Sequence, residues 1–137
     1  ELEIRDKKVM IMDDSIVRGN TSREIVRMLK DFGAKEVYFA VACPPVNSPC
    51  FYGVDMPTKS ELIAGNMNED EIENYLEVDG LLYQKIDDLV EAVTRKGDHH
   101  IDTPCMACLD GNYIANDIND AKIAQMEAMR VNDRNGK

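Results

Sequence analysis

The sequence has no long apolar run and no excess of positive charge. A membrane-spanning helix needs about 20 consecutive apolar residues, and no stretch of the 137 residues approaches that length. The 16 Lys and Arg against 26 Asp and Glu leave a net charge of −10, which would repel nucleic acids and anionic membranes. We therefore expect neither as a partner. A phosphorylated small molecule is not excluded, because a few local groups suffice to hold it.

Cysteine is also scarce, and a secretory leader is not recognisable. Four cysteines without dense spacing in an acidic chain are typical of a reducing cytoplasm, where structural disulfides are not expected. The sequence begins at Glu1 rather than at a methionine, which favours a piece of a longer protein. With no internal repeats and a 44% hydrophobic fraction, we expect one globular domain.

The most informative stretch runs from Lys8 to Ser22. The apolar residues Val9 to Met12 are typical of a parallel strand buried on both faces. Asp13 and Asp14 follow where that strand would end, and a loop rich in small and hydroxylated residues leads into an amphipathic segment. Such a loop offers backbone N–H groups and a helix dipole to a phosphate at the carboxyl edge of a sheet. The two carboxylates suit sugar hydroxyls or Mg²⁺.

The rest of the chain predicts an α/β fold with a parallel sheet and flanking helices. Thr21 to Glu24 has the form of a capping box, which predicts a helix start. Gly33 is typical of a residue that ends a helix. Between them, one apolar helix face is expected at Ile25, Met28, Leu29 and Phe32. Further strands are expected at 36–43, 51–55 and 81–83, and further helices at 58–64, 68–76, 86–95 and 121–130, with an irregular connector at 44–49.

The stretch from Val9 to Ser22 resembles the phosphoribosyl diphosphate signature of the type I phosphoribosyltransferases. The longer wording, MIMDDSIVRGNTSREIVRML and GAKEVYFAVACPPVNSPCFYGVDMPTKSELIA, is similar to the amidophosphoribosyltransferases (glutamine phosphoribosylpyrophosphate amidotransferases) within that group. The similarity extends to about Ile114. It implies that residues 1–117 are the carboxyl-terminal part of a phosphoribosyltransferase domain and 118–137 a helical or flexible tail. The family's glutaminase domain and the first half of the transferase domain would lie outside this chain.

The resemblance also implies a reaction and a site. The intact protein would make 5-phosphoribosylamine from phosphoribosyl pyrophosphate and glutamine-derived ammonia, the first committed step of purine synthesis, with purine nucleotides as feedback inhibitors. It would be a homo-oligomer, whereas this piece alone would be inactive. No catalytic side chain is assigned. The implied substrate-binding residues, of which the first two would also contact Mg²⁺, are Asp13, Asp14, Ser15, Arg18, Gly19, Asn20, Thr21 and Ser22.

Cys105 and Cys108 form a C-x-x-C pair, whose spacing alone leaves zinc, redox pairing and coincidence open. Family members with a [4Fe–4S] cluster carry matching cysteines at Cys50, Cys105 and Cys108, and their fourth ligand would lie upstream of this chain. Cys43 is expected to be a buried core thiol. His99 and His100 show no ligand spacing with the cysteines and are expected at the surface.

Two alternatives remain open. The first is a non-catalytic phosphoribosyl- or nucleotide-binding module with the same loop. The second is a response-regulator receiver domain, which also begins with a strand, two acids and a helix, and for which Asp55 would be the phosphoacceptor. Asp55 lies directly before Met56-Pro57, whereas in receivers that aspartate stands two residues before the Met-Pro pair. A Walker-type nucleotide loop is excluded, because no Gly-Lys-Ser/Thr occurs.

Overall fold

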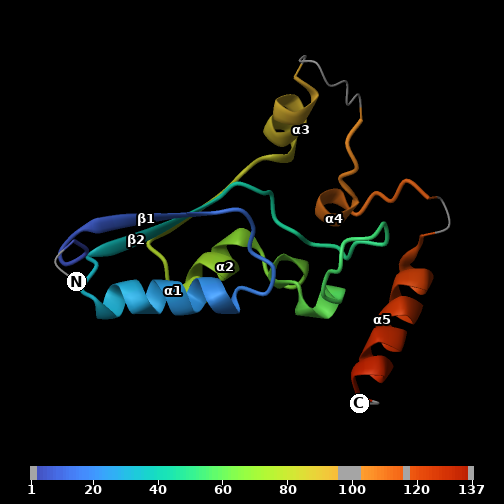
Figure 1. Cartoon of the computed structure of the whole chain (residues 1–137), viewed down its shortest axis with the longest axis horizontal. Coiled ribbons are helices and arrows are strands. Elements are labelled where there is room, and N and C mark those ends of the chain that lie inside the picture. The colour runs from blue at the N-terminus through green and yellow to red at the C-terminus, as the bar shows by residue number, and fades with distance from the viewer. Residues whose placement is uncertain (1–2, 96–102, 116–117, 136–137) are drawn as a thin grey trace.

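The computed structural model describes residues 3–95, 103–115 and 118–135, and it has an α/β fold (Figure 1). In this part of the chain, β1 (Lys8–Asp13), β2 (Glu36–Val41) and β3 (Gly80–Tyr83) form a sheet in that order. Both strand pairs are parallel, and Ile11 lies opposite Phe39, which lies opposite Leu81. The predicted α/β class and parallel sheet are confirmed.

The helices occur close to the predicted positions. Each of the expected apolar helical patterns corresponds to an observed helix, and one further short helix, α4, carries part of the C-x-x-C motif. The helices are α1 (Asn20–Asp31), η1 (Lys59–Glu61), η2 (Ile63–Gly65), α2 (Glu69–Leu76), α3 (Ile86–Thr94), α4 (Ala107–Asp110) and α5 (Asp120–Asn135), of which η1 and η2 are single 3₁₀ turns. None of the described helices is both long and apolar enough to cross a lipid bilayer.

The main core lies between one face of the sheet and helices α1 and α2. Val37 and Phe39 from β2 point into it and meet Val26 of α1 and Ile72 and Leu76 of α2, all almost fully buried. Truncation of a buried phenylalanine such as Phe39 to alanine costs about 3–5 kcal/mol. A second cluster, built on Val46, Leu62 and Leu109, joins the irregular connector to the region of α4.

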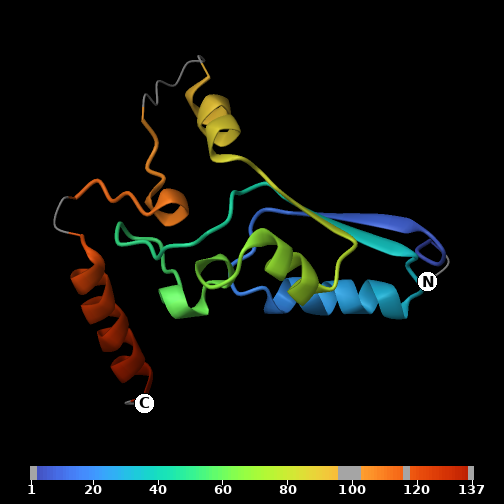
Figure 2. The same ribbon diagram turned by 180° about the vertical axis from the view of Figure 1, so that it is seen from behind.

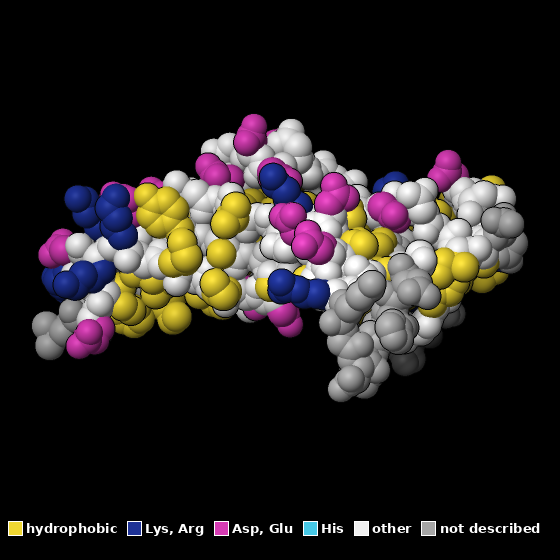
Figure 3. All heavy atoms as spheres, turned by 90° about the horizontal axis from the view of Figure 1, so that it is seen from above, with side chains coloured by type: hydrophobic (Ala, Val, Ile, Leu, Met, Phe, Trp, Pro, Cys, Tyr) yellow, Lys and Arg dark blue, Asp and Glu magenta, His cyan; other side chains and the backbone are white. Residues whose placement is uncertain are grey.

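The opposite face of the sheet is open, so the expectation that β1 is buried on both faces was wrong. Figures 1 and 2 show α1 and α2 on the same side of the strands. On the other side, Met10 is 65%, Met12 76% and Leu82 66% exposed. Figure 3 looks onto this side, where hydrophobic side chains gather over the strands. The residues of β1 alternate between the two faces, so only half of this apolar strand reaches the core.

The start of α1 also differs from the prediction. Thr21 to Glu24 does not form a capping box, because α1 already begins at Asn20 with Gly19 as its N-cap, and none of the described side chains caps it. The buried face includes Ser22 and Val26, while the predicted positions Met28 and Phe32 are exposed. The helix is therefore rotated relative to the expected apolar stripe. Its predicted end at Gly33, which has φ +88°, is confirmed.

The segment 51–55 is not a strand. Residues Phe51–Asp55 form bends and coil, and the third strand of the sheet is Gly80–Tyr83, which the sequence predicted only as a short candidate. The two later capping boxes are confirmed. Thr58 pairs reciprocally with Glu61 at η1, and Asn68 pairs with Glu71 at α2. Acidic side chains at positions 69–71 occupy the first turn of α2, as the helix dipole favours.

Candidate functional site

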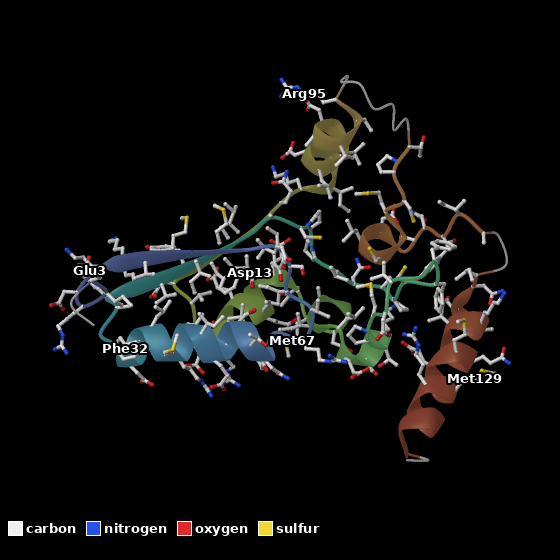
Figure 4. All side chains as sticks on the ribbon, in the orientation of Figure 1. Glu3, Asp13, Phe32, Met67, Arg95 and Met129 are labelled. Carbon is white, nitrogen blue, oxygen red and sulfur yellow. The ribbon has the colours of Figure 1, made fainter. Side chains whose placement is uncertain are left out.

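The loop between β1 and α1 forms a hollow at the carboxyl edge of the sheet. Figure 4 shows Asp13 at the end of β1 near the start of α1, and Phe32 at the far end of that helix. The hollow has a volume of about 380 Å³. The structure brings seven of the eight predicted substrate-binding residues to it. Its lining comprises Asp13, Ser15, Val17, Arg18, Gly19, Asn20, Thr21 and Ser22.

The eighth predicted residue, Asp14, is exposed beside the hollow. Its backbone N–H donates to Oδ1 of Asp13 at 2.9 Å, and its own Oδ1 accepts from the Ser15 hydroxyl at 3.1 Å. A carboxylate has about four lone-pair positions, so one such hydrogen bond leaves acceptor capacity. The two acids can therefore still accept from sugar hydroxyls or bind a hard cation.

Gly19 shapes the junction between the loop and α1. Its φ of +78° is in the left-handed region that favours glycine. A Cβ at this position would lie 2.7 Å from Cδ1 of Ile63 and 3.2 Å from Cε1 of Tyr75. The first helical bond runs from the Arg23 N–H to the Gly19 carbonyl at 2.9 Å. Because no side chain in the described part of the chain caps α1, the N–H groups of its first residues are available to an anion.

Two residues distant in sequence contact this loop, and the sequence did not assign either to the site. Nη2 of Arg18 donates to Oε1 of Glu61 at 3.0 Å, and the Tyr75 hydroxyl donates to Oδ1 of Asn20 at 3.1 Å. The capping-box pattern located Glu61 at a turn, but no local pattern could indicate that its carboxylate would reach Arg18. These contacts arise only because η1 and α2 pack beside the loop.

An ion-pair cluster joins α1 to the end of α2. Oε1 of Glu77 accepts from Arg23 at 2.9 Å and from Arg27 at 3.0 Å. Hydrogen bonds from Arg27 and then Arg23 lower the pKa of Glu77, and the hydrogen bond to Glu77 raises the pKa of Arg23. Arg27 and Glu77 are exposed and Arg23 is partly exposed, so we assign the cluster an orienting role rather than a large share of stability.

The segment 103–113, which carries Cys105 and Cys108, packs against residues 47–51, which include Cys50. The backbone N–H groups of Asn47 and Ser48 both donate to the Cys108 carbonyl at 3.1 Å. Tyr113 donates to the Pro49 carbonyl at 2.7 Å, and its ring lies 5.2 Å from that of Phe51. A metal site shared by Cys50, Cys105 and Cys108 requires these two segments to lie side by side, and they do.

The thiols themselves are not arranged as a metal site. Burial raises the pKa of Cys108, and the nearby Cys50 and Cys105 raise it further. All four cysteines are free. Within the described ranges, no group of three or more His, Cys, Asp or Glu side chains is placed to hold a metal ion. The cysteines of this chain alone therefore do not fit a closed cluster site.

The remaining predicted residues have simpler outcomes. Cys43 packs against the second core cluster but is half-buried rather than fully buried. Burial, and secondarily Cys108, raises the pKa of the Cys43 thiol. His99 and His100 lie outside the described residues. Asp55 is exposed in coil and does not directly follow a strand, whereas the phosphoacceptor of a receiver domain stands at the end of a strand.

Comparison with known proteins identifies clear relatives, although no protein-family model matches the sequence. The amidophosphoribosyltransferase of Pseudomonas aeruginosa is 44% identical over 130 residues, covering 95% of this chain and 26% of the relative. That of Methanocaldococcus jannaschii is 47% identical over 80% of this chain and 22% of the relative. That of Escherichia coli is 39% identical over 96% of this chain and 26% of the relative. The chain thus spans about a quarter of these proteins.

Solved structures agree with the sequence relatives. The glutamine phosphoribosylpyrophosphate amidotransferase from B. subtilis, complexed with ADP and GMP, has a TM-score of 0.74 at 40% identity. The match covers 85% of this chain and 26% of that one. A structure described as the allosteric regulatory enzyme of purine biosynthesis has a TM-score of 0.76 at 39% identity, over 90% of this chain and 27% of its own. The chain is therefore homologous, in sequence and in fold, to one part of the amidophosphoribosyltransferases.

Proposed function

We propose that this chain supplies the phosphoribosyl site of an amidophosphoribosyltransferase. The intact protein would make 5-phosphoribosylamine from phosphoribosyl pyrophosphate and glutamine, opening purine synthesis. The observation that carries the proposal is the hollow at residues 13–22, where an uncapped helix start, one arginine and an acid pair converge. The homology supports it, because the relatives bear that enzyme's name.

The loop would hold the 5′-phosphate of the substrate. Backbone N–H groups at the start of α1 carry the positive end of the helix dipole, and the guanidinium of Arg18 adds a full charge at the rim. The hydroxyls of Ser15 and Thr21 would complete the hydrogen bonding. Asp13 and Asp14 would accept from the ribose hydroxyls, which lie on the far side of the bound sugar from the phosphate.

The reaction we propose is displacement of diphosphate by ammonia at the anomeric carbon. The C–O bond breaks with its electron pair on the diphosphate, and a C–N bond forms through an oxocarbenium-like state. Such chemistry requires positioning and charge compensation rather than a nucleophilic side chain. On this proposal, the negative charges of Asp13 and Asp14 would stabilise the positive charge that develops on the sugar.

Mg²⁺ is the cofactor proposed for this site. It is commonly bound by one or two carboxylates together with substrate phosphates rather than by an all-protein cage. The adjacent carboxylates of Asp13 and Asp14 fit that donor set. Bound Mg²⁺ would supply charge compensation for the diphosphate leaving group.

An iron–sulfur cluster is proposed only for the intact protein. The thiolates of Cys50, Cys105 and Cys108 are soft ligands suited to a [4Fe–4S] cluster. The segment 103–113 already contacts residues 47–49, directly before Cys50. A fourth ligand would come from outside this chain, and the thiols would have to converge. Iron analysis of the intact, anaerobically purified protein tests this: about four irons are expected, and Cys105→Ser should release them. Absence of iron in the wild type would refute the cluster.

We also propose partners and a compartment for the intact protein. ADP and GMP are bound in the related B. subtilis structure, which supports purine nucleotides as inhibitors of the intact protein. We also propose a homo-oligomer for the intact protein. The four free cysteines favour a reducing compartment such as the cytoplasm.

A titration separates this function from the alternatives. We expect phosphoribosyl pyrophosphate with Mg²⁺ to shift the backbone amide NMR signals of Gly19 to Ser22, and ribose alone to shift them far less. Beryllofluoride mimics an aspartyl phosphate and tests for a receiver domain. It should not shift the backbone amide NMR signal of Asp55. Phosphoribosylamine synthesis by the intact protein then distinguishes the enzyme from a non-catalytic binding module. If phosphoribosyl pyrophosphate with Mg²⁺ does not shift these signals, the phosphate site is refuted.

A further inference from the structure

Arg18 is the sole Lys or Arg among the described residues that line the hollow at 13–22. Its guanidinium is tied to a residue 43 positions away, because Nη2 donates to Oε1 of Glu61 at 3.0 Å. A guanidinium has five N–H donors in a fixed fork. One bond to Glu61 therefore leaves further donors for an anion.

Glu61 is held on a well-braced turn. Its Oε2 accepts from the Thr58 N–H at 3.0 Å and from the Thr58 hydroxyl at 2.8 Å. The amide of Asn66 donates to three carbonyls of the same turn, those of Lys59, Ser60 and Leu62. The N–H of Ile63 donates to the Val17 carbonyl at 2.9 Å, which joins this turn directly to the loop. The two carboxylate oxygens of Glu61 thus have separate tasks, one in the turn and one on Arg18.

We propose that Glu61 is a positioning residue for the phosphate site, acting through Arg18. An unrestrained arginine loses side-chain entropy when it binds a ligand, and restraint beforehand reduces that loss. Glu61 restrains the guanidinium at the rim of the hollow, so that its remaining donors meet a phosphate monoester. This inference rests on the proposed phosphate site.

The test measures the affinity of the full 137-residue chain for ribose 5-phosphate, which carries the phosphate without the diphosphate. We expect Glu61→Ala to weaken binding about three- to tenfold and Arg18→Ala about tenfold or more. In the Arg18→Ala background, Glu61→Ala should have almost no further effect, because Glu61 acts through Arg18. Glu61→Asp, which restores the charge with a shorter reach, should recover part of the affinity.

Two controls separate positioning from general stability. Glu71→Ala removes the equivalent capping-box glutamate at α2, whose Oε2 accepts from the Asn68 N–H at 2.8 Å. Glu71 does not line the hollow at 13–22. Thr58→Val removes the hydroxyl bond to Glu61 but leaves the Arg18 contact. Both should keep the affinity within about twofold of the wild type. Far-ultraviolet circular dichroism and urea unfolding verify that each variant is folded.

The outcomes are distinct. If the wild-type chain does not bind ribose 5-phosphate, the phosphate site and this inference both fail. If it binds but Glu61→Ala weakens binding equally with and without Arg18, Glu61 acts through the fold, and this inference alone is overturned. Tighter binding by Glu61→Ala would also overturn it, because Glu61 would then be holding Arg18 away from the ligand.

Discussion

The hydroxyl of Tyr75 donates to Oδ1 of Asn20 at 3.1 Å, although 55 residues separate the two in sequence. The same ring lies beside Gly19 and beneath the guanidinium of Arg23, whose Cζ is 4.6 Å from the ring centroid. Helix α2 therefore braces the point where the loop becomes α1. The loop is held in shape by side chains from another part of the chain.

The first prediction concerns that brace. Tyr75→Phe keeps the ring but removes the hydrogen bond to Asn20, so we expect a loss of about 0.5–1.5 kcal/mol in unfolding free energy. Tyr75→Ala also removes the packing on Gly19 and should cost about 2–4 kcal/mol. Urea unfolding measures both. If Tyr75→Ala is no more harmful than Tyr75→Phe, the ring does not brace the loop.

The second prediction concerns Gly19. Gly19→Ala forces both a left-handed backbone and a steric clash with Ile63, so a destabilisation of about 2–4 kcal/mol is expected. Gly53→Ala is the matched control, since Gly53 also has a positive φ, +114°, but no atom within 4 Å of its added Cβ. It should cost only about 1 kcal/mol. Equal effects in urea unfolding would show that the clash is relieved by small shifts.

The third prediction concerns the acid pair in the intact, longer protein. Asp13→Asn combined with Asp14→Asn keeps the side-chain volumes but removes both charges, so we expect transferase activity to be abolished. Glutaminase activity should partly survive, because on the proposed function it would belong to a domain outside this chain. Asp87→Asn with Asp88→Asn changes another adjacent pair, at the start of α3, and should leave both activities intact. Equal loss of the two activities by the Asp13 and Asp14 variant would indicate a structural role.

The fourth prediction concerns Tyr83, whose hydroxyl is buried without a hydrogen-bond partner in the described part of the chain. Burial raises the pKa of Tyr83 from 10.0 to about 12. The folded state therefore retains a proton that the unfolded state loses, and stability should fall as the pH rises from about 10 to about 12. Tyr83→Phe should remove this loss and add about 0.5–2 kcal/mol at neutral pH.

Urea unfolding at several pH values, with ultraviolet absorbance of tyrosinate, checks this prediction. Tyr38→Phe is a suitable control, because the Tyr38 hydroxyl is satisfied by Oε2 of Glu36 at 2.6 Å. That substitution should destabilise the chain slightly rather than stabilise it. A Tyr83 hydroxyl that titrates at its ordinary pKa would contradict the expected burial effect.

The fifth prediction concerns the open face of the sheet. Met12→Lys places a charge on a side chain that is 76% exposed, so stability should change by less than about 0.5 kcal/mol. Self-association of the isolated chain should decrease, because an exposed apolar patch favours association. Ile11→Lys is the control on the core-facing side of the same strand and should strongly destabilise the fold. Sedimentation velocity and urea unfolding measure the two effects.

Much of the fold could be predicted because its signals are local. The apolar run before Asp13, the glycine after α1 and the capping boxes at Thr58 and Asn68 each depend on neighbours within a few residues. The loop at 13–22, for which we propose phosphate binding, belongs to the same class, since its strand, acids and helix are contiguous. Contiguous residues can be related to one another without knowledge of how distant segments pack.

The sequence-based predictions were wrong where a local preference competes with tertiary packing. Thr21 to Glu24 has the pattern of a capping box, but the left-handed turn at Gly19 starts α1 earlier. Met10 and Met12 are as apolar as any buried strand residue, yet α1 and α2 cover only the other face. The apolar segment after Cys50 lies outside the sheet, and β3 occupies the place beside β2 instead.

The sequence by itself determined the α/β class, the parallel pairing of the first two strands and seven of the eight residues that line the hollow at 13–22, because these depend on periodicity and chain continuity. Only the tertiary structure decided that Glu61 reaches Arg18 and that Tyr75 reaches Asn20. Only the tertiary structure decided that the Cys108 carbonyl accepts hydrogen bonds from residues 47 and 48. It also decided that the described cysteines do not converge on a metal site. Such contacts join residues tens of positions apart, and their geometry depends on how the helices pack against the sheet.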